Sequence, residues 1–318
     1  MKVGFLTSYK LEELAWAGEH DLESFELVGF EASPLAKDSD WKPAADRLRE
    51  TAAKSGLKLS CIGALYANPV APNQSEFGLV TFKRAVDVAA YLKVKTVAGF
   101  PGAPIHVKKA EWGGHTVYEP FEDHLKEFRA FWEPVARYAK DKGVRIAFEH
   151  CAAGIYHQPV QSFNIMGRIG MWEKVFNELP DNVGLEWDAS HLQCQFIDPI
   201  DNIHKYGRRI FHVHAKDAYI NSTLLRQYGI CHHGVAEHRF PGMGQANWAE
   251  IVHALLRAGY DSDLNIEGWH DPIWRDHGAD QPADVKSHGV DHQAGQKLEK
   301  AGVINAVRFL KQFTAGTE

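Results

Sequence analysis

The strongest constraint on the fold is an alternation of short β-like runs with longer amphipathic runs along the whole chain. Eight runs have strand length and are rich in β-branched and aromatic residues. They are 2–7, 25–31, 57–65, 94–100, 144–151, 183–190, 209–215 and 263–269. Runs with apolar residues at helical spacing lie between most of them, at 41–55, 76–92, 120–142, 170–179, 199–206, 247–258 and 293–312. This alternation favours parallel strands joined by crossover helices.

Eight strand–helix units in 318 residues predict a single closed (β/α)8 barrel, the TIM-barrel fold, as one domain over residues 1–318. An open doubly wound sheet is the alternative, but no GxGxxG motif follows the first strand. Long loops are predicted at 101–120, 152–167, 217–247 and 269–293. In a barrel these loops all lie over the C-terminal face, where active sites are built.

Charge and hydropathy argue against two classes of partner. The formal net charge is -6 and no basic run occurs, which disfavours nucleic acid. No apolar stretch is long enough to span a membrane, and the apolar run at the N-terminus is too short for a signal peptide. The four cysteines are far apart and are expected to be reduced, buried residues. We therefore expect a cytoplasmic protein.

The alternation of side chains along a strand selects a candidate site. On each of the last four strands the large apolar residues share one parity, and a polar residue near the C-terminal end has the other. These polar residues are Glu149, Asp188, His214 and Glu267. Three buried carboxylates need a counter-charge, and a divalent cation is the simplest one. An oxygen-rich set with one imidazole suits Mn²⁺, Mg²⁺ or Zn²⁺.

Ion pairs within the barrel are the alternative to a metal. Arg145 and Lys216 are also predicted to point inward, and either could neutralise a carboxylate. Glu186 is predicted inward but one layer deeper, with an ion pair to Arg145 or a hydrogen bond to His212. The same parity predicts that Phe211 faces outward.

An ordered series of short motifs covers the second half of the chain. It comprises FEH at 148–150, WDASHL at 187–192, FHVHAKD at 211–217, RFPGMGQANW at 239–248 and NIEGWHDP at 265–272. The series resembles the xylose isomerase-like TIM-barrel superfamily, in particular its sugar phosphate isomerase/epimerase branch. The resemblance implies one divalent metal ion held by Glu149, Asp188, His214 and Glu267. We expect Mn²⁺ first, with Mg²⁺, Zn²⁺ and Co²⁺ as alternatives.

The resemblance also implies roles around this metal. Glu149 and Glu267 would be catalytic, moving protons on opposite faces of a sugar beside a carbonyl that the metal polarises. His191, Lys216, Asp217 and Arg239 correspond to substrate-binding positions. For Asp217 the alternative is to orient Lys216 or a loop, and for Arg239 it is a loop-anchoring ion pair. No arginine accompanies the sequence GFPGAP at 99–104, so a phosphorylated substrate is not indicated.

Several functions remain open from the sequence. The first is a metal-dependent sugar isomerase or epimerase. The second is a lyase of the same superfamily, an inosose-type dehydratase or a 3-keto-glycoside β-eliminating enzyme, one variant of which works with a small partner subunit. A homo-oligomer is also open. The superfamily's abasic-site endonucleases are disfavoured, because Phe100 and Ala236 stand where metal ligands are expected.

Overall fold

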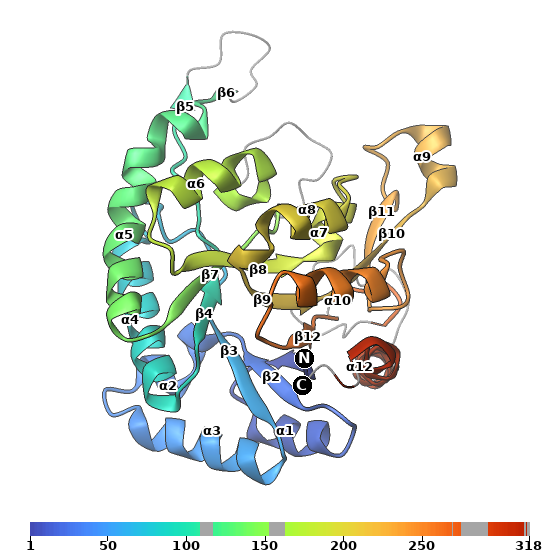
Figure 1. Cartoon of the computed structure of the whole chain (residues 1–318), viewed down its shortest axis with the longest axis horizontal. Helices are drawn as coiled ribbons and strands as arrows, with labels where there is room; N and C mark the ends of the chain where they lie inside the picture. Colours follow the sequence, from blue (N-terminus) through green and yellow to red (C-terminus); the bar gives the residue numbers. More distant parts are fainter. Residues whose placement is uncertain (109–116, 153–162, 269, 275–291, 315, 317–318) are drawn as a thin grey trace.

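Eight parallel strands close into a barrel in the computed structural model, which describes residues 1–108, 117–152, 163–268, 270–274, 292–314 and 316 (Figure 1). The strands are β1 (Val3–Thr7), β2 (Ser24–Leu27), β3 (Lys58–Leu65), β4 (Thr96–Gly99), β7 (Arg145–Glu149), β8 (Val183–Asp188), β9 (Ile210–Ala215) and β12 (Leu264–Ile266). β1 pairs in parallel with both β2 and β12, so the sheet has no edge. The predicted (β/α)8 barrel is confirmed.

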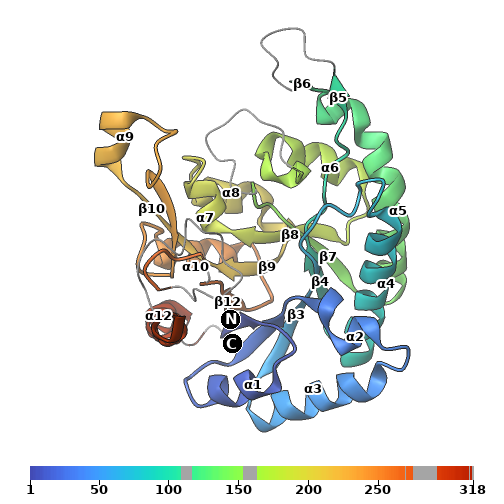
Figure 2. The ribbon, with the colours of Figure 1, turned by 180° about the vertical axis from the view of Figure 1, so that it is seen from behind.

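Helices surround this barrel. They are α1 (Leu11–Gly18), α2 (Pro34–Lys37), α3 (Lys42–Lys54), α4 (Ser75–Leu92), α5 (Leu125–Asp141), α6 (Trp172–Glu178), α7 (Ala189–Gln193), α8 (Pro199–Tyr206), α9 (Ser222–Tyr228), α10 (Trp248–Arg257) and α12 (His292–Thr314). Figure 2 shows α4 and α5 along one flank, with α10 and α12 on the other. In the described part of the chain, no helix has the length and apolar character needed to cross a bilayer.

Every predicted strand overlaps an observed one, although some boundaries differ. The second was predicted to run to residue 31, but β2 ends at Leu27 because Gly29 adopts a left-handed conformation (φ 63°) and starts the 3₁₀ turn η1 (Phe30–Ala32). The predicted helix at 120–142 begins with another 3₁₀ turn, η2 (Phe121–His124), before α5. Trp269 and parts of the long predicted loops lie outside the described residues.

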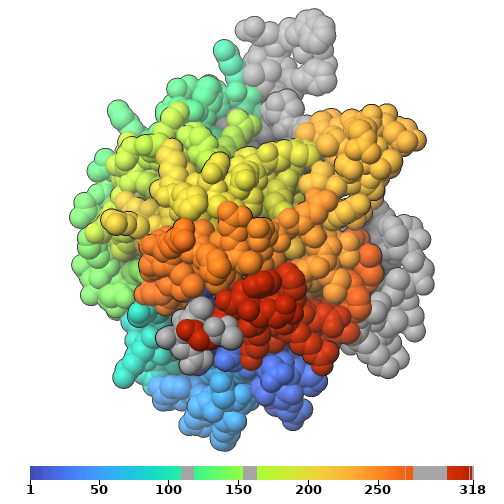
Figure 3. All heavy atoms as spheres, turned by 45° about the vertical axis from the view of Figure 1, so that its right-hand side comes forward, coloured from blue at the N-terminus to red at the C-terminus, as the bar shows by residue number. Residues whose placement is uncertain are grey.

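Two antiparallel hairpins interrupt the barrel pattern at its C-terminal face. β5 (Val107–Lys108) pairs with β6 (Val117–Tyr118), and β10 (Asp217–Ile220) pairs with β11 (Ala236–Arg239). Both fall within segments that we predicted as long loops. Between β10 and β11 the chain forms α9, which protrudes from the molecule (Figure 3).

The apolar faces of the strands pack against the helices, as parity predicted. Trp132, Trp172, Trp187 and Trp248 are all buried in this layer. Phe211 is an exception, because the β8–β9 register shifts between Leu185 and Glu186. Its ring therefore clusters with the small side chains of Cys61, Ala98 and Ala147, and the outward prediction for Phe211 was wrong.

The turn of Phe211 into the barrel depends on Gly184 of β8. A Cβ atom at Gly184 would lie 2.2 Å from the Arg209 carbonyl oxygen and 2.6 Å from the Phe211 ring. We expect Gly184→Ala to lower the free energy of unfolding by about 1–3 kcal/mol through overpacking. Urea or thermal unfolding would measure the loss. Gly170→Ala is the matched control, because a Cβ there meets nothing within 4 Å. Equal stability of the two variants would contradict this packing.

Candidate metal centre

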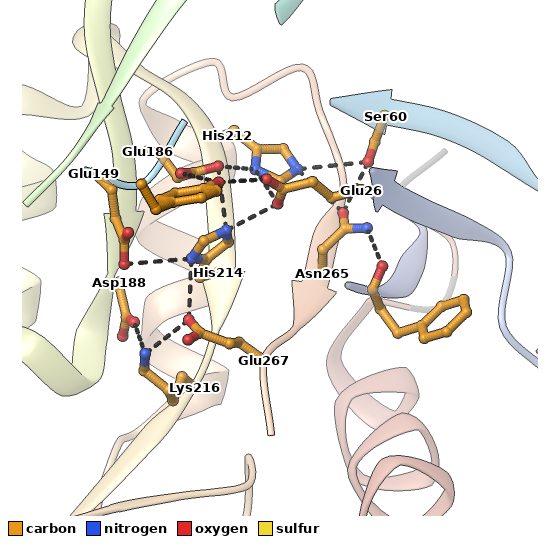
Figure 4. A network of polar contacts seen from close by, with 12 residues as sticks. Glu26, Ser60, Glu149, Glu186, Asp188, His212, His214, Lys216, Asn265 and Glu267 are labelled. Atoms are coloured by element: carbon orange, nitrogen blue, oxygen red, sulfur yellow. Dashed lines mark hydrogen bonds and ion pairs between the residues drawn. The ribbon is translucent and has the colours of Figure 1, made fainter. Parts of the chain in front are cut away.

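The four predicted ligands meet at the C-terminal end of the barrel (Figure 4). Glu149 ends β7, Asp188 ends β8, His214 belongs to β9 and Glu267 follows β12. One donor atom of each lies within 4.8 Å of the donor atoms of the other three, and all four residues are buried. Because adjacent parallel strands end at the same level, the barrel converts four positions far apart in sequence into one cluster.

Two atoms of this cluster are suited to binding a cation. The Asp188 Oδ1 atom accepts hydrogen bonds from the Ser190 backbone N–H and hydroxyl, both 2.7 Å away. Its Oδ2 atom and the Nδ1 atom of His214 are buried without a well-formed hydrogen bond among the described residues. His214 Nδ1 lies 3.1 Å from Glu267 Oε2 and 3.7 Å from Glu149 Oε1. Two such atoms among carboxylate oxygens fit a divalent ion.

Lys216 provides part of the counter-charge. Its Nζ atom lies 2.7 Å from Glu267 Oε2 and 3.0 Å from Asp188 Oδ2, and the side chain is buried. Although burial favours the neutral amine, these carboxylates raise the pKa of Lys216 well above its ordinary value. One ammonium cannot balance the three carboxylates of Glu149, Asp188 and Glu267. The ion-pair alternative is therefore present for Lys216, which by itself neutralises one of these three negative charges.

Arg145 does not take part in this cluster. Its guanidinium Nη1 atom pairs with Asp261 at 3.0 Å, and it does not form the ion pair considered for Glu186. Glu186 instead lies 3.0 Å from His212 Nδ1, as the other alternative predicted.

His191 lies against the same carboxylates. Its Nε2 atom is 3.2 Å from Glu149 Oε1 and 3.4 Å from Asp188 Oδ2. Burial opposes protonation of the ring, but its interactions with Cys151 and Asp188 raise the pKa of His191 to about 10. Cys151 is partly exposed, and it forms a possible ligand group with Glu149 and His191. The expectation that all four cysteines are buried was therefore wrong for Cys151, and also for the exposed Cys231.

Asp217 and Arg239 have structural contacts. The Asp217 carboxylate accepts hydrogen bonds from the backbone N–H groups of Ala218, Gly242 and Ala246 and from the indole of Trp248. Arg239 Nε lies 3.0 Å from Asp271 Oδ2, which also accepts the Phe240 N–H. These contacts support the loop-anchoring alternatives for both residues. They do not support the predicted substrate-binding role.

A deeper polar layer holds His214 from below, and it includes Glu26 and Tyr66, which the sequence analysis did not identify, beside the predicted Glu186. His214 Nε2 lies 2.8 Å from Glu26 Oε2 and 3.2 Å from Glu186 Oε1. A carboxylate can only accept, so the Nε2 atom carries a hydrogen and the Nδ1 atom faces the cluster. Although burial favours the neutral ring, Glu186 and Glu26 raise the pKa of His214 well above its ordinary value, so a bound cation would replace the proton on Nδ1. The Tyr66 hydroxyl lies 2.7 Å from Glu26 Oε1 and 2.9 Å from Glu186 Oε2. Such a carboxylate–histidine pair orients metal ligands.

Close packing around Tyr66 requires a glycine in β3. A Cβ atom at Gly63 would lie 2.7 Å from both the Glu26 Oε1 atom and the Tyr66 hydroxyl. Glu26 stands between Phe25 and Leu27 and has the opposite parity to these apolar residues, and parity is the rule that identified Glu149 and Asp188. Applied to the second strand, this pattern would have found it.

His150 supports Asp188 from outside the barrel. The ring packs against Trp172, with 5.0 Å between centroids, and its Nε2 atom accepts the Asp188 backbone N–H at 2.9 Å. Burial lowers the pKa of His150 to about 3, so the ring is neutral and can accept this bond.

The site and the barrel agree with a known family. The sequence model of the xylose isomerase-like TIM barrel family matches residues 14–292. The chain belongs to this family. The resemblance drawn from the motifs at 148–272 is thereby confirmed at the level of the family.

Curated relatives match shorter parts of the chain. The uncharacterized protein YfiH of Bacillus subtilis (strain 168) is 25% identical over 205 residues, which are 58% of this chain and 62% of that protein. An inosose dehydratase of Lacticaseibacillus casei is 31% identical over 103 residues, 29% of this chain and 33% of the relative. The matches span less than two thirds of the length of either relative.

Solved structures share the whole fold at low sequence identity. A D-psicose 3-epimerase in the presence of D-fructose has a TM-score of 0.67 and 18% identity, covering 99% of this chain and 100% of that one. The IolI protein with a binding zinc atom has a TM-score of 0.60 and 18% identity, with coverage of 99% and 100%. At this identity the likeness shows the fold alone.

The ion pairs of Lys216 predict a metal-dependent effect on stability. We expect Lys216→Met to lower the free energy of unfolding of the metal-free protein by about 3–5 kcal/mol, because it leaves buried carboxylates unpaired. Added Mn²⁺ is expected to make the loss of unfolding free energy in Lys216→Met smaller. The bound cation then supplies the positive charge that the lysine supplied to the carboxylates. Chemical denaturation with chelator and with Mn²⁺ would measure both values. Lys205→Met, on the surface of α8, is the control and should change little. A deficit that Mn²⁺ leaves unchanged would count against metal binding.

The contact between Glu26 and His214 predicts a loss of metal affinity from outside the ligand set. We expect Glu26→Gln to weaken Mn²⁺ binding about 10–100-fold, because the ring of His214 loses its fixed orientation. Calorimetric titration would measure the dissociation constant. Glu50→Gln on the exposed face of α3 is the control. Native affinity in Glu26→Gln would show that the orientation of His214 does not depend on Glu26.

Proposed function

We propose that this chain is a divalent-metal-dependent sugar isomerase or epimerase that moves a proton beside a carbonyl group. The observation that carries the proposal is the placement of Glu149 and Glu267. Their strands, β7 and β12, are separated in the barrel by β8 and β9, so the two carboxylates approach His214 from different directions (Figure 4). A small substrate lying between them would have one glutamate on each face, as an epimerisation requires.

The metal ligands we propose are Glu149, Asp188, His214 and Glu267. When bound, a divalent cation supplies positive charge that polarises the oxygen atoms of the substrate. Mn²⁺ is our first choice because three of the four donors are carboxylates. The zinc atom named for the IolI structure supports a divalent ion in a protein of this fold without choosing among metals.

The chain's own groups would then handle the proton. Although burial favours the protonated acid, Lys216 and His214 hold the pKa of Glu267 well below its ordinary value. Glu149 also has a lowered pKa, with hydrogen bonds from His191 and His214 opposing the effect of burial. Both glutamates are thus deprotonated, the state required of a residue that removes a proton. We propose that one glutamate removes the proton and keeps it, and that the other, after taking up a proton from solvent, donates that proton to the opposite face.

We further propose an unphosphorylated substrate, held by His191 and Lys216. Lys216 is already paired with two carboxylates, and Arg239 is paired with Asp271. Among the described residues of the site, these cations are therefore committed to ion pairs. A phosphate group would need several free donors to bind, whereas neutral sugar hydroxyls need only single hydrogen bonds.

A lyase reaction is the second candidate, favoured by the similarity to an inosose dehydratase. It begins with the same proton removal beside a carbonyl. It then ends with departure of a neighbouring oxygen substituent, to which the Lys216 ammonium can donate a proton. The residues that start the two reactions are the same, so their products must separate them.

Turnover in heavy water tests the proposal directly. We expect the Mn²⁺-loaded protein to incorporate deuterium at the carbon beside the carbonyl when given ketohexoses, inososes or 3-keto-glycosides. Glu149→Gln and Glu267→Gln should each reduce the rate about 10²–10⁴-fold, because each removes one proton-transfer group. Mass spectrometry and NMR of the products would measure both effects. Epimers would support the epimerase, and products that have lost water or an aglycone would support the lyase.

Controls separate the chemistry from folding. Glu173→Gln, on the surface of α6, should retain native turnover. Isomerisation without deuterium incorporation would contradict proton transfer and indicate a hydride shift. Unchanged metal content and turnover in Glu149→Gln would contradict the whole proposal.

A further inference from the structure

A second group of metal-type donors lies away from the barrel site, beside the β5–β6 hairpin. It consists of His106 and Glu119 at the two ends of the hairpin, His124 in η2 and Glu127 in the first turn of α5. Figure 1 shows β5 and β6 beyond the end of α5, at the margin of the molecule. Nothing in the proposed reaction uses these four residues.

The donor groups are close together, and the two imidazole rings are nearly parallel. His106 Nε2 lies 2.7 Å from Glu127 Oε2, and His124 Nε2 lies 2.7 Å from Glu119 Oε2. The two imidazole rings stack with their centroids 3.8 Å apart and 17° between their planes. One donor atom each from His106, His124 and Glu127 lie within 4.8 Å of one another. The rings must rotate out of this stacked arrangement to bind one ion, because each nitrogen lone pair lies in the plane of its ring.

The backbone holds the four side chains in two preorganised pairs. The Glu119 N–H donates to the His106 carbonyl oxygen at 2.9 Å, which fixes these two residues opposite each other across the hairpin. His124 and Glu127 are three residues apart at the start of a helix, a spacing that places side chains on one face. The hairpin and the start of the helix therefore each contribute one histidine and one glutamate to the group.

The local charge favours a cation at this place. Residues 119–127 contain four acidic side chains and one lysine. Glu122 is neutralised by Lys174 at 2.7 Å, but Glu119 and Glu127 meet only the two histidines in the ion pairs that the described residues show. Two carboxylates with two neutral imidazoles carry a net charge of about −2, which one divalent cation balances. Protonating both rings would instead stack two cations against each other.

We propose that His106, Glu119, His124 and Glu127 form a second divalent-cation site, separate from the barrel site and suited to zinc. Two imidazole nitrogens and two carboxylate oxygens are a tetrahedral donor set that Zn²⁺ accepts. The ion takes the place of the hydrogen at each Nε2 atom, and that hydrogen moves to the Nδ1 atom of the same ring. The hairpin is then tied to the start of α5 through the metal as well as through hydrogen bonds.

Zinc stoichiometry tests this site. The metal-free full chain is titrated with Zn²⁺ and the bound metal is counted by elemental analysis after gel filtration. We expect about two zinc ions per chain for the native protein and one fewer for H106N/H124N. The matched control is H204N/H253N, which removes two exposed histidines on α8 and α10 and should keep the native count. The visible spectrum of the Co²⁺ form gives a second readout, in which H106N/H124N loses the bands of one four-coordinate ion.

The outcomes separate this site from the barrel site. Asp188→Asn removes a barrel ligand, and it should leave the zinc that H106N/H124N removes. If the native chain binds one zinc and H106N/H124N binds none, the result supports the peripheral site and contradicts zinc binding at the barrel site. If H106N/H124N keeps both the native zinc count and the native Co²⁺ spectrum, the peripheral site is overturned.

Discussion

Five carboxylates are buried together in the upper part of the barrel, and the rest of the site is arranged around their charge. They belong to Glu26, Glu149, Glu186, Asp188 and Glu267. Each would be costly to bury alone, so each has a cationic or hydrogen-bonding neighbour. Lys216, His191, His212 and His214 supply these neighbours from α7 and from the end of β9. The fold tolerates this charge because strands from different parts of the sequence contribute the opposite signs.

The two layers of this charge have different tasks. In the lower layer Glu26, Glu186 and Tyr66 are satisfied by one another and by the histidines, so the layer is a fixed support. In the upper layer His214 Nδ1 and Asp188 Oδ2 have charged neighbours but no well-formed hydrogen bond among the described residues. A rigid lower layer beneath an adaptable upper one is what a metal site needs, since ligands must be aimed before the ion arrives.

Sequence reasoning reached the barrel and the four central residues because both follow from local pattern. Strand–helix alternation gave the topology, and strand parity selected Glu149 and Asp188 from their apolar neighbours. Strand parity gave the wrong orientation for Phe211 because the β8–β9 register shifts beside it. A register shift depends on contacts between strands, which the sequence of one strand does not show. For Asp217 and Arg239 the sequence did not reveal which residues they contact. Their polar partners, such as Asp271, come from distant loops, so the motif marked important residues without revealing what they contact.

Gly63 of β3 affects the candidate metal site through the residues that it packs against. It is not one of the four proposed ligands, yet a methyl group there would collide with both Glu26 and Tyr66. A substitution at this position would therefore act at a distance, by tilting the imidazole of His214. Positions 26, 63 and 66 are therefore coupled by packing, and a larger residue at position 63 fits only if the tyrosine or the glutamate is replaced by a smaller residue.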